Sequence, residues 1–165
     1  MTPADVLRVG REPHPDVLAV VRRYGVELRL LADGEKVTGT FWGDSEAGLR
    51  GNELFVRADT PVHSMLHELS HYVCMTADRR GTLHRDAGGD DAEECGVCYL
   101  QILLAGEIAS VGRDRMLADM DAWGYTFRLG SARDWFERDA ADASDWLTSE
   151  GLVDPAGIPT FMLRR

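Results

Sequence analysis

Residues 60–74 read Thr-Pro-Val-His-Ser-Met-Leu-His-Glu-Leu-Ser-His-Tyr-Val-Cys, and this stretch predicts the central helix of the fold. Thr60 offers a hydroxyl that can cap a helix, and Pro61 suits the first helical position. One side carries an apolar stripe with helical spacing, formed by Val62, Leu66, Leu69 and Val73. His67 and His71 lie roughly 100–180° around the helix from that stripe. The helix is therefore expected to have a core side and a separate polar side.

Residues 67–71, His-Glu-Leu-Ser-His, have the pattern H-E-x-x-H. Residues four apart share one face of a helix, so His67 and His71 can bind one metal ion. Zinc accepts such ligands and, in catalytic sites, keeps a position for a water whose pKa it lowers to about 7. Glu68 can take the proton of that water. The alternative is a chance pair of surface histidines, but the motif, the helix start and the separate faces all favour a metal site.

A third protein ligand must come from elsewhere. The metzincin continuation of the motif is absent, since Cys74 stands at its glycine position and Ala77 at its third histidine. A carboxylate from a following helix is the other source, and Glu94, one turn into a predicted helix, is the preferred candidate. Glu93 is its close competitor. Asp90 and Asp91 are the remaining candidates. The simpler role of these acidic residues is to complement the dipole at the start of a helix.

The strand expected at residues 52–57, the motif helix and the helix from Glu94 to Leu104 together resemble the minimal gluzincin core, most of all that of the ImmA/IrrE-type metallopeptidases. Those proteins follow H-E-x-x-H with a helix of pattern E-A-N-x-F-A-x-x-L-L. Here residues 94–103 read Glu-Cys-Gly-Val-Cys-Tyr-Leu-Gln-Ile-Leu, in which the glutamate and the two closing apolar positions match. The resemblance covers roughly residues 15–105. It implies a zincin-like fold and an edge strand near Leu54–Val56 that binds an extended substrate by strand addition.

The order of the expected elements indicates an α+β fold, with a small three-stranded sheet, an active-site helix, a following glutamate helix and a helical C-terminal part. A helix and three strands come first, at residues 13–24, 26–31, 37–42 and 52–57. The later helices are expected at about 60–76, 90–105 and 113–123 and around Trp135 and Trp146. Residues 77–90 look like a loop. We expect one domain over residues 1–165, with a core at about 15–105 and a helical extension at 106–165.

Four further side chains are candidates for contacts near the metal: His63, His84, Tyr99 and Tyr125. His63 precedes His67 by one turn. A role in supporting the metal ligands or contacting substrate and an exposed position at the helix start remain equal alternatives. His84 can either stabilise an oxyanion from its loop or be a plain loop residue. For both tyrosines, packing in the core is the preferred interpretation.

The cysteines Cys74, Cys95 and Cys98 are odd in number, and no secretion signal is recognised at the N-terminus, so we expect reduced thiols. Cys95 and Cys98 form a C-x-x-C with no second copy, which excludes a four-cysteine zinc site within one chain. A packed helix face is the preferred interpretation for this pair. Three tryptophans are expected to fill the C-terminal core: Trp123, Trp135 and Trp146.

The net charge of −10 and the pI of about 4.9 argue against binding to nucleic acid or an anionic membrane. No apolar run is long enough to span a bilayer, and we expect a cytoplasmic protein. The predicted function is a zinc metallopeptidase that acts on a peptide or protein substrate, with Glu68 as general base and His67, His71 and Glu94 as metal ligands. The alternatives are a zinc-binding regulatory module of the same fold and a non-proteolytic metal hydrolase.

Overall fold

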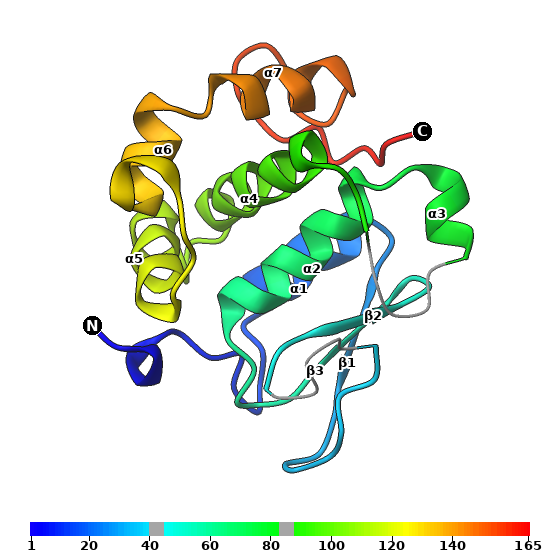
Figure 1. The fold of residues 1–165 in the computed structure, drawn as a ribbon. Helices are drawn as coiled ribbons and strands as arrows, with labels where there is room; N and C mark the ends of the chain where they lie inside the picture. Colours follow the sequence, from blue (N-terminus) through cyan, green and yellow to red (C-terminus); the bar gives the residue numbers. More distant parts are fainter. Residues whose placement is uncertain (40–44, 83–87) are drawn as a thin grey trace.

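The computed structural model describes residues 1–39, 45–82 and 88–165. Within them the chain forms an α+β fold of seven α-helices and one three-stranded sheet. Helix α2 (Val62–Cys74) packs with one side on the sheet and with the other on α4 (Asp91–Gly106), as Figure 1 shows. Two helices contacting each other over the sheet therefore form the middle of the molecule.

The sheet has the strand order β1-β3-β2. Strand β3 (Glu53–Val56) pairs in parallel with β1 (Glu27–Leu30) and antiparallel with β2 (Gly48–Arg50). The strands predicted at residues 26–31 and 52–57 are thus confirmed. The expectation that Leu54–Val56 forms an edge strand is wrong, because β3 is the central strand and its hydrogen-bonding groups are engaged on both sides.

The second strand lies further along the chain than the sequence indicated. Val37, at the start of the strand expected at residues 37–42, is buried without being in a strand, and residues 40–44 lie outside the described residues. The pairing strand is β2, joined to β3 by a tight turn at Gly51, whose φ of 58° favours glycine. Pairing with β3 decides which segment becomes a strand, and the local apolar pattern at Val37 does not.

Most predicted helices are confirmed. They are α1 (Pro15–Arg23), α2, α4, α5 (Arg113–Trp123), α6 (Ala132–Arg138) and α7 (Ala141–Ser149). Two details differ. A short helix, α3 (Ala77–Gly81), occupies the start of the expected loop. Helix α2 begins without a side-chain cap, because the Thr60 hydroxyl accepts a hydrogen bond from the backbone N–H of Arg57 at 2.8 Å instead.

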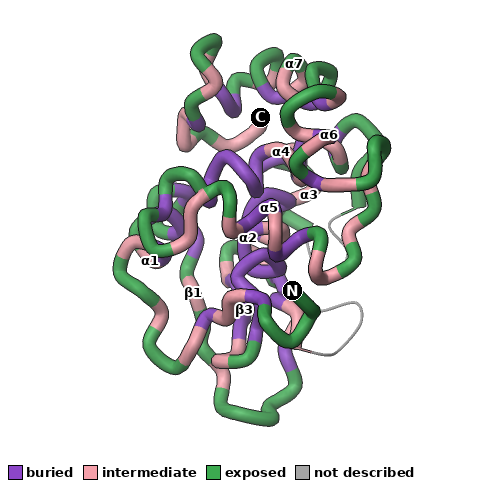
Figure 2. The backbone as a smooth tube through the Cα atoms, turned by 90° about the vertical axis from the view of Figure 1, so that its left-hand side faces the viewer, coloured by how far each residue is buried: buried purple, intermediate pink, exposed green. Residues whose placement is uncertain are grey.

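The buried residues form one cluster that runs from the N-terminal segment to α7 and beyond it (Figure 2). The predicted stripe of α2 is fully within it: Val62, Leu66, Leu69 and Val73. Trp146 of α7 packs so closely on α4 that a Cβ at Gly96 would lie 2.6 Å from its ring. Trp135 is also buried, as expected. Among the described residues, no helix combines the length and the apolar character needed to cross a membrane.

Candidate metal centre

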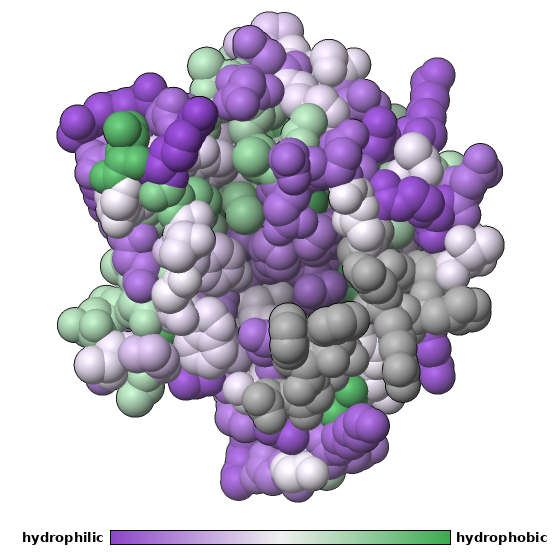
Figure 3. Space-filling model, in the orientation of Figure 1, coloured by the Kyte–Doolittle hydropathy of each residue, from purple (hydrophilic) through white to green (hydrophobic). Residues whose placement is uncertain are grey.

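The polar side of α2 faces α4. His67 and His71 project from successive turns of α2, and their Nε2 atoms are 3.1 Å apart. Their side chains are 18% and 10% exposed, so both imidazoles are largely withdrawn from water but still reachable. In Figure 3, hydrophilic residues lie at the centre of the face where α2 and α4 run side by side.

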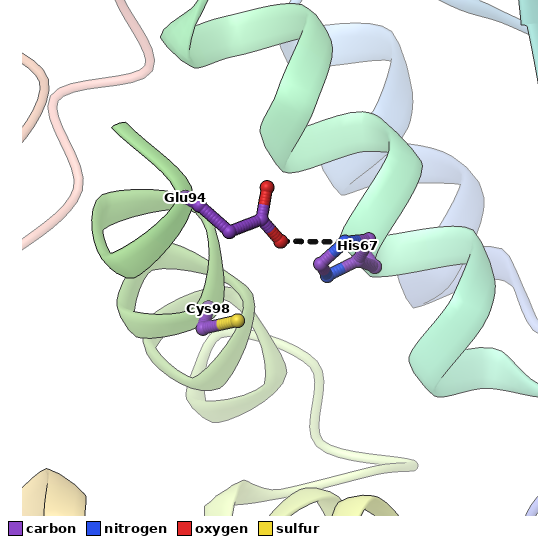
Figure 4. A group of neighbouring side chains, drawn as sticks. All are labelled: His67, Glu94 and Cys98. Atoms are coloured by element: carbon purple, nitrogen blue, oxygen red, sulfur yellow. Dashed lines mark ion pairs between the residues drawn. The ribbon is translucent and has the colours of Figure 1, made fainter. Parts of the chain in front are cut away.

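Glu94 reaches the same point from α4. Its Oε1 lies 3.4 Å from Nε2 of His67, and its Oε2 lies 3.3 Å from Nε2 of His71. Figure 4 shows the carboxylate directed from α4 toward His67. The start of α4 fixes this position, because Asp90 caps the helix by accepting a hydrogen bond from the backbone N–H of Glu93 at 2.9 Å. Three candidate ligands predicted from the sequence are therefore brought together.

The spacing of these atoms fits a tetrahedral metal site. Ligand atoms bound at 2.0–2.1 Å around a tetrahedral zinc ion are about 3.3–3.4 Å apart. The three observed separations are 3.1, 3.3 and 3.4 Å. Little rearrangement is needed for His67, His71 and Glu94 to hold one ion.

Glu93 points elsewhere. Its carboxylate is buried, with Oε2 at 2.7 Å from Nη1 of Arg79 and at 3.2 Å from Nη1 of Arg164. Arg164 also pairs with Glu150 at 2.8 Å, so this carboxylate ties α4 to α3 and to the C-terminal segment. The carboxylate of Glu93 thus forms ion pairs with two arginines, and the geometry favours Glu94 as the third metal ligand.

Cys98 adds a fourth potential ligand to the centre. It lies one turn after Glu94 on α4, and its sulfur, a nitrogen of His67 and an oxygen of Glu94 all lie within 4.8 Å of one another. Figure 4 shows all three side chains. Cys98 does pack against the core as expected, but its thiol also faces His67. All three cysteines are free, as expected, and Cys74 is buried, which raises the pKa of its thiol.

Gln101, which was not predicted as a site residue, supports the first histidine of the motif. Its Oε1 accepts a hydrogen bond from Nδ1 of His67 at 2.9 Å, and its Nε2 donates to the backbone carbonyl of His63 at 3.0 Å. Gln101 is fully buried. The sequence feature that could have identified it is a single amide side chain inside the otherwise apolar run of residues 99–105.

His63 is buried rather than exposed. Its Nδ1 lies 3.2 Å from the hydroxyl of Tyr125, and its ring contacts Trp123 at a centroid distance of 4.9 Å. Trp123 thus borders the centre, whereas it was expected to fill the C-terminal core. The ring of Tyr125 also lies 5.9 Å from that of His67, so Tyr125 belongs to the centre. Tyr99, in contrast, stacks on Phe136 of α6 at 4.6 Å, in line with the packing interpretation.

Burial and charge shift the pKa values of these groups. Burial, helped by the nearby cations of His67 and Arg8, lowers the pKa of His63 to about 3, so this imidazole is neutral. Burial opposes protonation of His67, but the surrounding Tyr125, Cys98 and Glu94 raise its pKa above the ordinary value. Burial would raise the pKa of Glu94, yet its contacts with His67 and His71 leave it lowered. The metal-free centre therefore holds a carboxylate against the imidazole of His67, which readily takes a proton.

The remaining two predicted site residues are Glu68 and His84. Glu68 is partly exposed on α2, directly after His67. His84 lies outside the described residues, so its two interpretations remain open.

Searches with protein-family models, against curated proteins and against solved structures found no match to this chain.

Proposed function

We propose that the protein is a zinc-dependent metallopeptidase with a zincin-like arrangement, in which His67, His71 and Glu94 hold the metal. One observation carries this proposal. The Nε2 atoms of His67 and His71 are 3.1 Å apart, and each lies 3.3–3.4 Å from a carboxylate oxygen of Glu94. These separations are close to those between ligand atoms around tetrahedral zinc. Histidine and carboxylate are also the usual protein ligands of catalytic zinc.

When bound, zinc supplies a Lewis acid that activates water and polarises a peptide carbonyl. The other steps belong to side chains of this chain. Glu68 accepts the proton of the attacking water and passes it to the leaving amine. Burial raises the pKa of Tyr125, which keeps its hydroxyl protonated and able to donate a hydrogen bond beside His67. Gln101 holds the His67 ring so that Nε2 faces Glu94, where the metal would bind.

A zinc-binding regulatory module remains the second candidate, because Cys98 offers the centre a fourth protein ligand. Zinc sites with four protein ligands are typically structural, whereas catalytic sites keep one position open. The presence of Glu68 favours hydrolysis over binding alone, since a metal scaffold needs the ligands and has no use for a base next to them. A non-proteolytic hydrolase would use the same groups, and digestion of a broad peptide library separates it from a peptidase.

Glu68→Gln tests the proposal. Glutamine is nearly isosteric with glutamate, so zinc content should equal that of the wild type, while peptide hydrolysis should fall by about 10²–10⁴-fold through loss of the base. Glu107→Gln, at an exposed position just after α4, is the matched control and should leave both unchanged. Full turnover in Glu68→Gln would refute this mechanism, and loss of zinc would give Glu68 a structural role instead.

A further inference from the structure

Helices α2 and α4 each direct a pair of side chains, spaced four residues apart, into the same centre. His67 and His71 form the pair on α2, and Glu94 and Cys98 form the pair on α4. The sulfur of Cys98 lies within 4.8 Å of a nitrogen of His67 and of an oxygen of Glu94. The three-ligand site described above uses only three of these four side chains.

We propose that Cys98 binds the same metal as a fourth protein ligand and closes its open position, which makes the centre latent until the thiolate is displaced. This inference rests on the proposed metal site. On binding, the thiol releases its proton to solvent and its sulfur forms a bond to the metal, with no change in oxidation state. A sulfur at 2.3 Å and a nitrogen at about 2.05 Å from a tetrahedral zinc ion are roughly 3.6 Å apart. The sulfur therefore has to approach the nitrogen of His67 by at most about 1.2 Å from the outer limit of 4.8 Å, which a rotation about χ1 of Cys98 can supply.

The other two cysteines do not compete for this role. Cys95 is partly buried, and the group of ligand atoms that lie within 4.8 Å of one another includes Cys98 but not Cys95. Cys74 is fully buried at the end of α2. A donor set of two imidazoles, one carboxylate and one thiolate suits zinc, and it also suits cobalt as a spectroscopic substitute.

Cobalt substitution tests the inference directly. The Co²⁺-loaded wild type should show a sulfur-to-cobalt charge-transfer band in the near ultraviolet. Cys98→Ser should lose the band, keep one cobalt per chain, bind it more than about tenfold more weakly and hydrolyse peptides faster. Cys95→Ser, from the same helix, is the matched control and should keep the band. Serine is close in size to cysteine, and Cys98→Ala provides a second variant if Cys98→Ser does not fold.

Alkylation with iodoacetamide, read by mass spectrometry, gives an independent measurement. Zinc should protect Cys98 from alkylation and leave the reaction of Cys95 unchanged. Cobalt that binds without a sulfur band, together with equal labelling of Cys98 with and without zinc, would overturn the role of Cys98 and leave the three-ligand site intact. A wild type that takes up no cobalt or zinc would overturn the proposed function itself, and with it this inference.

Discussion

Oε1 of Gln101 lies 2.9 Å from Nδ1 of His67, and this contact determines which nitrogen of His67 faces Glu94. The amide oxygen can only accept, so Nδ1 carries the hydrogen. The amide cannot turn over without loss, because its Nε2 donates to the carbonyl of His63 at 3.0 Å. When His67 is neutral, its lone pair is therefore on Nε2, the atom that faces Glu94 and the proposed metal position.

Gln101→Met should weaken zinc binding by roughly 10–100-fold, because methionine has a similar length but cannot accept the Nδ1 hydrogen. Leu103→Met, on the same helix and also buried, is the matched control and should change the zinc affinity little. Competition with a fluorescent chelator measures both. Equal affinities in the two variants would show that the hydrogen bond to Gln101 does not support the metal site.

Substitutions of the two neighbouring glutamates of α4 should have different effects on zinc binding and on stability. Glu94→Ala should abolish tight zinc binding with little effect on the stability of the metal-free protein, since Glu94 is half exposed. Glu93→Ala should retain zinc but lower the free energy of unfolding by about 2–3 kcal/mol, because Arg79 and Arg164 lose their shared partner. Chelator competition and urea unfolding give the two readouts. The reverse ranking for zinc would assign the third ligand to Glu93.

His63 should make the metal-free protein sensitive to acid. Its pKa is about 3 in the folded protein against an ordinary 6.5, so between these values the unfolded chain binds a proton that the folded chain does not. The contribution of His63 to the free energy of unfolding therefore falls as the pH falls from 6.5 toward 3, by about 1.4 kcal/mol per pH unit. In His63→Gln, urea unfolding at several pH values should show a shallower decline. An unchanged slope would contradict the neutral, buried state of His63.

Zinc affinity should fall on acidification. The pKa of His67 is raised by its neighbours, so protons begin to compete with the metal above pH 6.5, the ordinary value for histidine. Each proton that the metal must displace lowers the apparent affinity by up to about tenfold per pH unit. Zinc titrations between pH 8 and pH 6 provide the measurement. An affinity independent of pH over that range would exclude protonated His67 as the competing form.

The helices were predictable because local signals determine them. The apolar stripe of α2 appears where the sequence indicated, Asp90 caps the helix expected at about residues 90–105, and Gly124 follows the end of α5 with a left-handed backbone. The sheet was less predictable. β2 has only three residues, and its partner, β3, is separated from β1 by a long segment, so the strand order depends on tertiary pairing.

The candidate ligands followed from a motif and a spacing, but their surroundings did not. Glu93 and Glu94 are adjacent residues of the same type, so the sequence does not distinguish their roles. The positions of Arg79 and Arg164, which pair with Glu93, do distinguish them. Those arginines come from α3 and the C-terminal segment, which local patterns do not connect. Gln101 acts through atoms of α2, so its role depends on how α2 and α4 pack.

The most direct test of the metal centre is a crystal structure of the zinc-loaded protein with anomalous data collected at the zinc absorption edge. We expect one peak per chain, about 2.0–2.1 Å from Nε2 of His67, from Nε2 of His71 and from an oxygen of Glu94. A protein that holds no zinc under conditions that load known zinc enzymes, or a peak located away from these three side chains, would contradict it.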